Sequence, residues 1–302
     1  MAPAPEPRAS QRRHHHRRHP NPDEGRRPVT TIGLLHPGSM GAAVGGQLVR
    51  AGHQVLWCPE GRSARTMERA ASNGLTASDL PQLLADAEVV LSICPPAAAE
   101  ALASTAQGYA GIWVEANAIT PQRTARIADL LPASMVVDGG IVGSPPTGSK
   151  HPTLYLSGPA ATDTVADMFA GTDVRTCILG NRIGQASALK LSYSSFQKAS
   201  RVLAAVSYGL AAEHDVEEEL LAIGGKRPGS YLTEIDYIPK TATRAWRWGP
   251  ELIEAADMLR DAGLPDEMLR AAAAALARWE QAKDDGRMDL PSALEQLRRP
   301  PG

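Results

Sequence analysis

Glycines between residues 33 and 41 are the first residues whose spacing indicates a chemical role. They form the pattern Gly33-x-x-His36-x-Gly38-x-x-Gly41. Glycines let the backbone turn sharply and approach a diphosphate without an intervening side chain, and the free N–H groups of a following helix attract the anion. The turn therefore predicts a dinucleotide phosphate site made of Gly33, His36, Pro37, Gly38, Ser39, Met40 and Gly41.

The segments on both sides of this turn are those that such a site requires. Residues 30–35 form a short apolar run typical of a buried strand, residues 42–49 have helical spacing, and residues 54–58 form a second strand. Strand, glycine turn, helix and strand within about thirty residues is the unit that binds a dinucleotide. His36 replaces the usual first glycine and is expected either to touch a phosphate or to cap the turn. The alternative is an ordinary turn whose glycines serve close packing.

A similar alternation continues through the first half of the chain. Strands are expected at residues 88–94, 111–117, 135–140, 153–158 and 174–179, and helices at residues 63–73, 80–87 and 97–106 and from Pro121, with Thr120 as cap. Strands alternating with helices predict an α/β fold with a Rossmann-like, mostly parallel sheet covered on both faces.

Ligands of such sheets bind beyond the carboxyl ends of the strands. We therefore expect residues 94–96, 115–117 and 139–144 to share one rim. Pro95 and Asn117 on this rim are candidate cofactor contacts.

The second half of the chain has a different character. Residues 184–214 contain no proline and are compatible with one long helix, and further helical segments follow to about residue 283. We expect a dinucleotide-binding domain at 29–182 and, joined to it by this helix, an all-helical substrate and dimerisation domain at 183–302. Trp246 and Trp248 are expected either to pack in a dimer or to contact substrate.

Residues 1–28 are unlike the rest of the sequence. They hold seven arginines, four histidines and six prolines with almost no large apolar side chain. Such a segment is expected to be disordered because it cannot bury enough surface to offset its ordering entropy. Two interpretations of this segment remain: a tail without a specific function, or an arm that binds metal or nucleic acid.

Composition excludes several classes of protein. The 302 residues carry 31 Lys+Arg against 33 Asp+Glu, which argues against a nucleic-acid binder. No apolar run approaches the roughly 18 residues of a membrane span. The three cysteines cannot form a disulfide framework, so a reducing cytoplasm is expected. Cysteine and histidine spacings predict no metal site outside the first 28 residues.

The choice of cofactor depends on the end of the second strand. An acid there binds the ribose hydroxyls of NAD, whereas arginine binds the phosphate of NADP. Both Glu60 and the group Arg62, Ser63 and Arg65 are present. The arginines and the serine can surround a phosphate at a helix start, which favours NADP, with NAD as the alternative.

Three motifs in register resemble the β-hydroxyacid dehydrogenase superfamily. They are the glycine turn with Met40-Gly41, the run Val137-Asp138-Gly139-Gly140-Ile141-Val142-Gly143, and Gly184-Gln185-Ala186-x-x-x-Lys190. The group includes 3-hydroxyisobutyrate and 6-phosphogluconate dehydrogenases and imine reductases, and the match covers everything after residue 28. The resemblance, to a branch with a distinctive short C-terminal helical domain, implies a nicotinamide-dependent oxidoreductase and a homodimer whose helical domains pack together.

The same resemblance implies that Lys190 is catalytic. In the family, a lysine in this context lies on the interdomain helix and faces the nicotinamide, where it exchanges a proton with the substrate oxygen as hydride moves. Tyr193, Ser194 and Gln197 share its helical face and are candidate substrate contacts. Ser194 stands where the family usually has asparagine, which indicates an altered substrate.

Two further comparisons narrow the expected reaction. Gln197 replaces the glutamate of the decarboxylating members, so oxidative decarboxylation of phosphogluconate is discounted. Imine reductases generally carry aspartate or tyrosine in place of the lysine, so Lys190 favours carbonyl or hydroxyl chemistry of a 3-hydroxyacid type, while Tyr193 keeps imine reduction open. The substrate-anchoring loop of the family corresponds to Val142, Gly143 and Ser144.

A hypothesis of another class also remains. His36, Val142 and Ser194 depart from the family pattern. These departures are compatible with a non-catalytic protein that binds a dinucleotide in order to regulate, because fold alone does not determine function.

Overall fold

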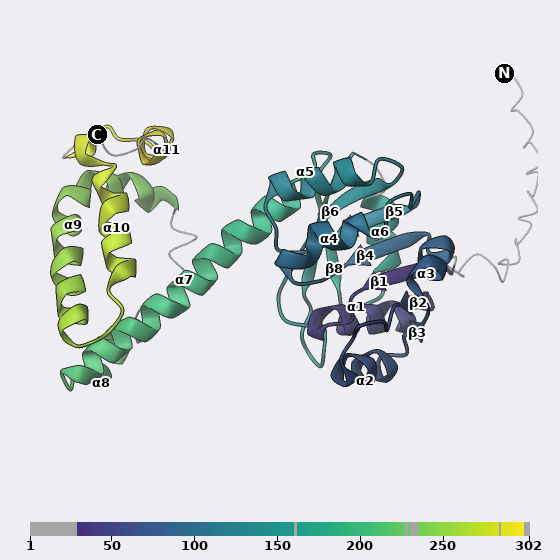
Figure 1. The fold of residues 1–302 in the computed structure, drawn as a ribbon. Coiled ribbons are helices and arrows are strands. Elements are labelled where there is room, and N and C mark those ends of the chain that lie inside the picture. Colours follow the sequence, from purple (N-terminus) through teal and green to yellow (C-terminus); the bar gives the residue numbers. More distant parts are fainter. Residues whose placement is uncertain (1–28, 160–161, 227–228, 230–234, 284, 299–302) are drawn as a thin grey trace, which may run out of the picture. The chain divides into compact units, whose positions relative to one another are not determined.

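The computed structural model describes residues 29–159, 162–226, 229, 235–283 and 285–298 (Figure 1). The chain divides into two compact units, one ending at Ala186 and the other beginning at Ser187. The basic tail expected at residues 1–28 lies outside the described residues. The functional boundaries at 29–182 and 183–302 stay a prediction.

An eight-stranded sheet forms the centre of the first unit, in the order β3-β2-β1-β4-β5-β6-β7-β8. All neighbouring pairs are parallel except β6 and β7. The α/β fold with a mostly parallel sheet, followed by helices, is thereby confirmed. The strands are β1 (Thr31–Leu35), β2 (Gln54–Trp57), β3 (Thr76–Ala77), β4 (Val89–Ser92), β5 (Ile112–Glu115), β6 (Met135–Val142), β7 (Thr153–Ser157) and β8 (Arg175–Gly180).

Helices cover both faces of this sheet because successive strand residues point to opposite sides. Ile32 and Leu34 of β1 pack in one cluster with Val44 of α1 and Val165 of α6, whereas Leu35 packs in the other with Leu83 of α3. The helices of the unit are α1 (Ser39–Arg50), α2 (Ala64–Ser72), α3 (Leu80–Asp86), the 3₁₀ turn η1 (Pro96–Ala98), α4 (Ala99–Ser104), α5 (Pro121–Leu130) and α6 (Thr162–Met168).

Local signals in the sequence account for several helix starts. Thr120 accepts a hydrogen bond from the Arg123 N–H, and Asp79 accepts one from the Gln82 N–H. Both are N-caps, which satisfy amides that have no partner within the helix. The Thr120 cap is confirmed, but the helix expected at residues 97–106 is divided between η1 and α4.

The long helix α7 (Gln185–Glu213) begins against the sheet. The buried Asp138 carboxylate accepts hydrogen bonds from the Gly184 N–H at 2.8 Å and from the Ser157 hydroxyl at 3.0 Å. Ser157 in turn accepts one from the Ala186 N–H at 3.0 Å. A carboxylate is thus held at the positive end of the helix dipole, which is favourable.

We expect Asp138→Ala to destabilise the first unit by about 3 kcal/mol, because buried amide and hydroxyl donors lose a charged acceptor. Urea unfolding followed by fluorescence of the buried Trp57 and Trp113 measures this loss. Ser157→Ala is the graded control and should cost about 1 kcal/mol. Equal losses in the two variants would contradict the role given to the charge.

The second unit is helical. Its core consists of Ala242, Ala245, Trp279, Ala282 and Ala293, and the Trp279 indole donates to the Ala293 carbonyl at 2.8 Å. Gly224 and Gly225 form the end of the helix α8 (Glu217–Gly225). Besides α7, the described elements are α8 (Glu217–Gly225), η3 (Ile235–Tyr237), α9 (Ile238–Asp261), α10 (Glu267–Ala277), η4 (Glu280–Ala282) and α11 (Leu290–Arg298).

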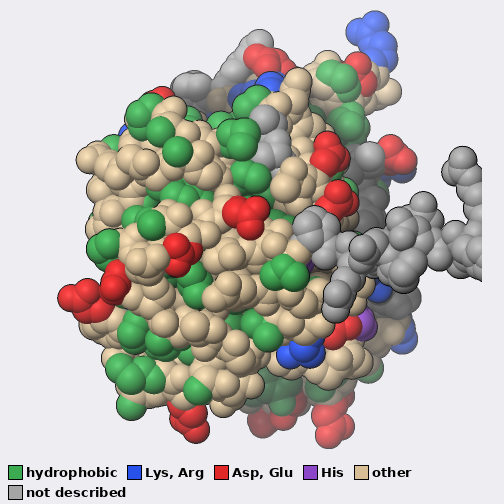
Figure 2. All heavy atoms as spheres, turned by 90° about the vertical axis from the view of Figure 1, so that its right-hand side faces the viewer, with side chains coloured by type: hydrophobic (Ala, Val, Ile, Leu, Met, Phe, Trp, Pro, Cys, Tyr) green, Lys and Arg blue, Asp and Glu red, His purple; other side chains and the backbone are tan. Residues whose placement is uncertain are grey.

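Charged side chains do not gather by sign on the face seen in Figure 2. Acidic and basic groups are scattered among hydrophobic ones there. In the described part of the chain no helix is long and apolar enough to cross a membrane.

Candidate functional site

The topology of the sheet locates a candidate site at the carboxyl ends of β1 and β4. These strands are parallel neighbours, and the chain leads from β1 to β2 on one side and from β4 to β5 on the other. Such a switch point leaves a crevice where α/β sheets bind ligands. The loops that follow the two strands meet here, because the His36 N–H donates to the Ile93 carbonyl at 3.1 Å.

The glycine turn after β1 has the geometry of an anion site. Gly38 is the N-cap of α1, no side chain caps the helix, and a Cβ on Gly38 would meet no atom within 4 Å. The first amides of a helix have no partner within the helix and attract anions. A Cβ on Gly41 would lie 2.3 Å from the His36 carbonyl oxygen, so the tight turn requires this glycine.

Gly33 is a correction to the predicted cofactor contacts. It lies buried in the middle of β1, where a Cβ would approach Leu83 to 2.5 Å. The absent side chain therefore allows α3 to pack closely on the sheet. The geometry gives Gly33 this packing role in place of a phosphate contact.

His36 supplies a neutral imidazole at the same turn. Its backbone makes the hydrogen bonds of the turn, and its buried Nδ1 has no partner in the described part of the protein. Burial, and then the nearby Arg62 charge, lower the pKa of His36 to about 4. The imidazole makes no cap hydrogen bond at the start of α1, and its predicted contact with a phosphate stays a prediction.

The residues predicted to bind the extra phosphate of NADP follow β2, which lies next to β1 in the sheet. Arg62 and Arg65 are exposed, and Ser63 caps α2 by accepting from the Thr66 N–H at 3.3 Å. Arg62 is near enough to His36 to affect its pKa. The exposed guanidinium group of Arg62, near His36 of the glycine turn, fits a phosphate monoester, and that of Arg65 follows three residues later.

The ends of β4 and β5 form the next part of the rim. The Asn117 side chain is buried; its Oδ1 accepts from the Cys94 N–H at 2.5 Å, and its Nδ2 donates to the Ser92 hydroxyl at 2.9 Å and to Glu115. Asn117 therefore holds the rim together, and a direct cofactor contact stays a prediction. Pro95, at the start of η1, is exposed on this rim.

Val142 is the last residue of β6, and Gly143 and Ser144 follow it in the next loop. Val142 is half-buried and the other two are exposed; Gly143 has φ +125° and lies against Pro152. The buried Gln47 of α1, which the sequence did not single out, donates to the Pro146 carbonyl at 3.3 Å and to Asp173 at 2.8 Å. Gln47 thereby ties the loop after Ser144 to the helix of the glycine turn.

The predicted catalytic group lies on α7 in the second unit. Ser194 is buried, and Lys190, Tyr193 and Gln197 are half-buried. Spacings of three, four and seven residues place all four on one helical face. That this face meets the nicotinamide stays a prediction.

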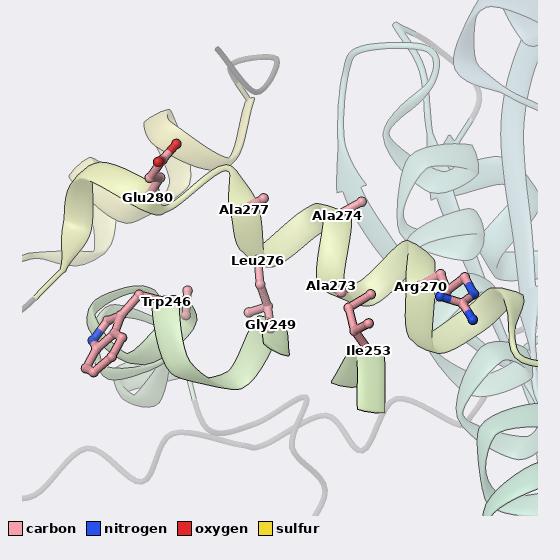
Figure 3. A pocket seen from close by; sticks show the side chains of 10 residues that line it. Trp246, Gly249, Ile253, Arg270, Ala273, Ala274, Leu276, Ala277 and Glu280 are labelled. Atoms are coloured by element: carbon pink, nitrogen blue, oxygen red, sulfur yellow. The ribbon is translucent and has the colours of Figure 1, made fainter. Parts of the chain in front are cut away.

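A cavity of about 600 Å³ lies between α9 and α10 in the second unit (Figure 3). Its lining is mostly apolar, and Trp246 at its edge is 46% exposed with the Lys283 ammonium 4.3 Å from its ring centre. Trp246 is thus a surface residue within one chain. In the described residues no group of His, Cys, Asp and Glu could hold a metal ion.

Two family models match parts of the chain. Residues 31–114 match the family described as "NADP oxidoreductase coenzyme F420-dependent", and residues 211–279 match a domain of unknown function, DUF1932. An uncharacterized 28.5 kDa protein of Methanothermus fervidus is 24% identical over 184 residues, which span 60% of this chain and 71% of that protein.

Solved structures resemble nearly the whole chain. A conserved protein of unknown function, described as similar to 3-hydroxyacid dehydrogenases, is 25% identical with a TM-score of 0.55 over 89% of this chain and 100% of that one. A reductive aminase from Aspergillus terreus, in complex with NADPH and ethyl-5-oxohexanoate, is 20% identical with a TM-score of 0.68 over 90% and 100%. An imine reductase from Pseudomonas is 17% identical with a TM-score of 0.65 over 89% and 100%.

These neighbours confirm the predicted resemblance. The chain has an oxidoreductase-type fold, similar to 3-hydroxyacid dehydrogenase-like proteins and imine reductases. Identities below 25% establish the fold alone, and the reaction depends on the residues of the site.

Proposed function

We propose that the protein is an NADP-dependent oxidoreductase that transfers hydride between the nicotinamide and a small hydroxyl or carbonyl substrate of the 3-hydroxyacid type. The observation that carries this is the uncapped start of α1 at the switch point, with open space in front of Gly38. A family described as NADP oxidoreductases matches this part of the chain, and similar structures contain NADPH. Titration of the full chain with NADPH, followed by nicotinamide fluorescence, tests it.

The preference for NADP rests on Arg62 and Arg65. We expect Arg62→Ala to weaken NADPH binding about tenfold to a hundredfold and to leave NADH binding nearly unchanged, because only NADPH carries the extra phosphate. Dissociation constants for both cofactors measure this. Arg69→Ala, in the helix α2 that follows Arg62, is the control. Equal losses for NADPH and NADH would place Arg62 away from that phosphate.

Lys190 is the proposed proton donor and acceptor. The bound cofactor supplies or accepts the hydride at the substrate carbon. In reduction the Lys190 ammonium donates a proton to the carbonyl oxygen, and in oxidation the neutral amine takes the hydroxyl proton. Tyr193, Ser194 and Gln197 are proposed to orient the substrate from the same face of α7, and the N–H groups of Gly143 and Ser144 to hold its carboxylate.

Imine reduction is the second candidate reaction, favoured by Tyr193 and by the imine reductase and reductive aminase neighbours. Turnover of a panel of small oxo-acids, aldehydes and cyclic imines separates the two reactions. A non-catalytic regulatory role would gain support if no compound oxidised NADPH faster with the natural protein than with Lys190→Ala.

A homodimer through the second unit is also part of the proposal. Large hydrophobic side chains on its helices are exposed within one chain, among them Leu221 at 61% and Ile223 at 66%. Contact with a second copy would remove these side chains from water. Sedimentation of the full chain checks the dimer. The cytoplasmic setting expected from the cysteines stays a prediction.

A further inference from the structure

The rim of the candidate cofactor site contains a buried carboxyl group that the proposed reaction does not use. Glu115 is the last residue of β5 and is fully buried. Its carboxyl group interacts with the Trp113 indole, with the side-chain amide and the backbone N–H of Asn117, and with the Ser92 hydroxyl. No cation in the described residues forms an ion pair with it, so neutral donors alone must stabilise its charge.

The hydrogen bonds of Asn117 determine which way its amide faces. The Cys94 N–H can only donate, so the atom that it contacts is the amide oxygen. The amide NH₂ group must then point to the Ser92 hydroxyl and to Oε1 of Glu115. Glu115 is therefore an acceptor toward Asn117.

The second oxygen of Glu115 is also an acceptor. Its Oε2 lies 3.2 Å from the Trp113 indole nitrogen, which can only donate. A carboxylate accepts at both oxygens, whereas a protonated carboxyl group or a glutamine amide presents one good acceptor and one donor. The arrangement of Trp113 and Asn117 thus suits the ionised form of Glu115.

Asn117 connects this carboxylate to the cofactor site. Its amide oxygen accepts from the Cys94 N–H, and the preceding residue, Ile93, bonds both the last residue of β1 and the first residue of the glycine turn. The Ile93 carbonyl accepts from the His36 N–H at 3.1 Å, and the Ile93 N–H donates to Leu35 at 2.6 Å. A shift of the Asn117 amide would therefore reach the wall formed by residues 93–96 and the start of the glycine turn.

We propose that Glu115 is a positioning residue for cofactor binding, whose carboxylate orients the Asn117 amide and so holds the wall at residues 93–96 against the glycine turn. This inference rests on the proposed cofactor site. It assigns Glu115 no contact with cofactor or substrate.

The proposed role makes cofactor binding sensitive to pH. Burial raises the pKa of Glu115 to about 7, so its charge changes near neutral pH. Cys94 faces it from the end of β4; burial, and then the Glu115 charge, raise the pKa of that thiol to about 11, and Arg123 of α5 lies near the thiol. The thiol stays protonated, and His36 titrates near 4. Binding should thus strengthen as pH rises through 7 and Glu115 ionises.

The first test is the dissociation constant of NADPH between about pH 5.5 and 8.5. We expect the affinity of the natural protein for NADPH to rise about tenfold as the pH rises through 7, because the ionised Glu115 then makes a charge-assisted hydrogen bond with Asn117. Glu115→Gln should bind weakly at every pH and lack this step. Asn117→Ala should lack it too, because the link to Cys94 is gone. Glu68→Gln, which removes an exposed acid on α2, is the control and should keep the step. Ionisation of the NADPH phosphate affects every variant equally, so the comparison of this control with Glu115→Gln removes its contribution.

A second readout needs no cofactor. In ¹⁵N–¹H spectra of the full chain, the Trp113 indole and Cys94 amide resonances should titrate near pH 7, and in Glu115→Gln they should not. A Cys94 amide that is insensitive to pH there, or a pH step in binding that survives in either variant, overturns the inference. Failure of the natural protein to bind NADPH at any pH would count against the proposed function. The pH titration of the Trp113 and Cys94 resonances would then test by itself whether Glu115 holds the Asn117 amide and the Cys94 backbone.

Discussion

Replacement of Lys190 by alanine is expected to lower kcat about a thousandfold. A positioned group that exchanges a proton with the substrate contributes about 10²- to 10⁴-fold to such reactions, and the proposed reaction gives this task to Lys190. The dissociation constant of NADPH should change little, because the amine acts on the substrate oxygen. Steady-state turnover with the best substrate of the panel, together with NADPH titration, measures both effects.

Two further variants make the Lys190 result specific. Lys190→Arg keeps the positive charge, but the guanidinium does not release its proton, so kcat should stay low. Lys226→Ala removes an exposed lysine at the end of α8 and should leave kcat unchanged. An active Lys190→Arg variant would show that this position needs charge and no proton transfer.

The second large effect is expected at Gly38. A Cβ here meets no protein atom within 4 Å, and φ is −65°, which alanine adopts readily. Gly38→Ala should therefore change the free energy of unfolding by no more than about 1 kcal/mol. The added methyl group enters the space that the diphosphate should occupy, so we expect NADPH affinity to fall at least about tenfold, a loss of about 1.4 kcal/mol.

Gly41→Ala is the matched comparison. Its Cβ would lie 2.3 Å from the His36 carbonyl oxygen, so the turn itself must shift, at a cost of about 1 to 3 kcal/mol. Unfolding in urea and NADPH titration of both variants separate the two effects. Undiminished NADPH affinity in Gly38→Ala would mean that the diphosphate lies elsewhere.

Local signals made much of the first unit predictable. Alternating apolar runs indicated the longer strands, and Thr120 before Pro121 indicated the start of α5. The two-residue strand β3 was missed because a strand so short has no periodicity to detect. The sequence also predicted a shared rim at the strand ends, since parallel neighbours end at the same edge.

The roles of individual rim residues were less predictable. Gly33 belonged to the glycine motif, but its contact is with Leu83, fifty residues away. Asn117 was a candidate cofactor contact, and the sequence did not show that its amide is bonded to Cys94, Ser92 and Glu115. The sequence did contain a hint of a role for Glu115, because it is a charged residue at the end of the apolar strand β5. Its role could not be predicted, because it depends on which hydrogen-bond donors surround the carboxylate.

The sequence by itself determined the order of strands and helices, the glycine turn and the resemblance to hydroxyacid dehydrogenases and imine reductases. These follow from residues close together in the chain, where periodicity, caps and turns act. Only the tertiary structure decided which buried polar groups meet, such as Gln47 with Asp173 and Asp138 with Gly184. Burial requires each such group to find a partner, but the partner comes from a distant segment that the fold brings beside it.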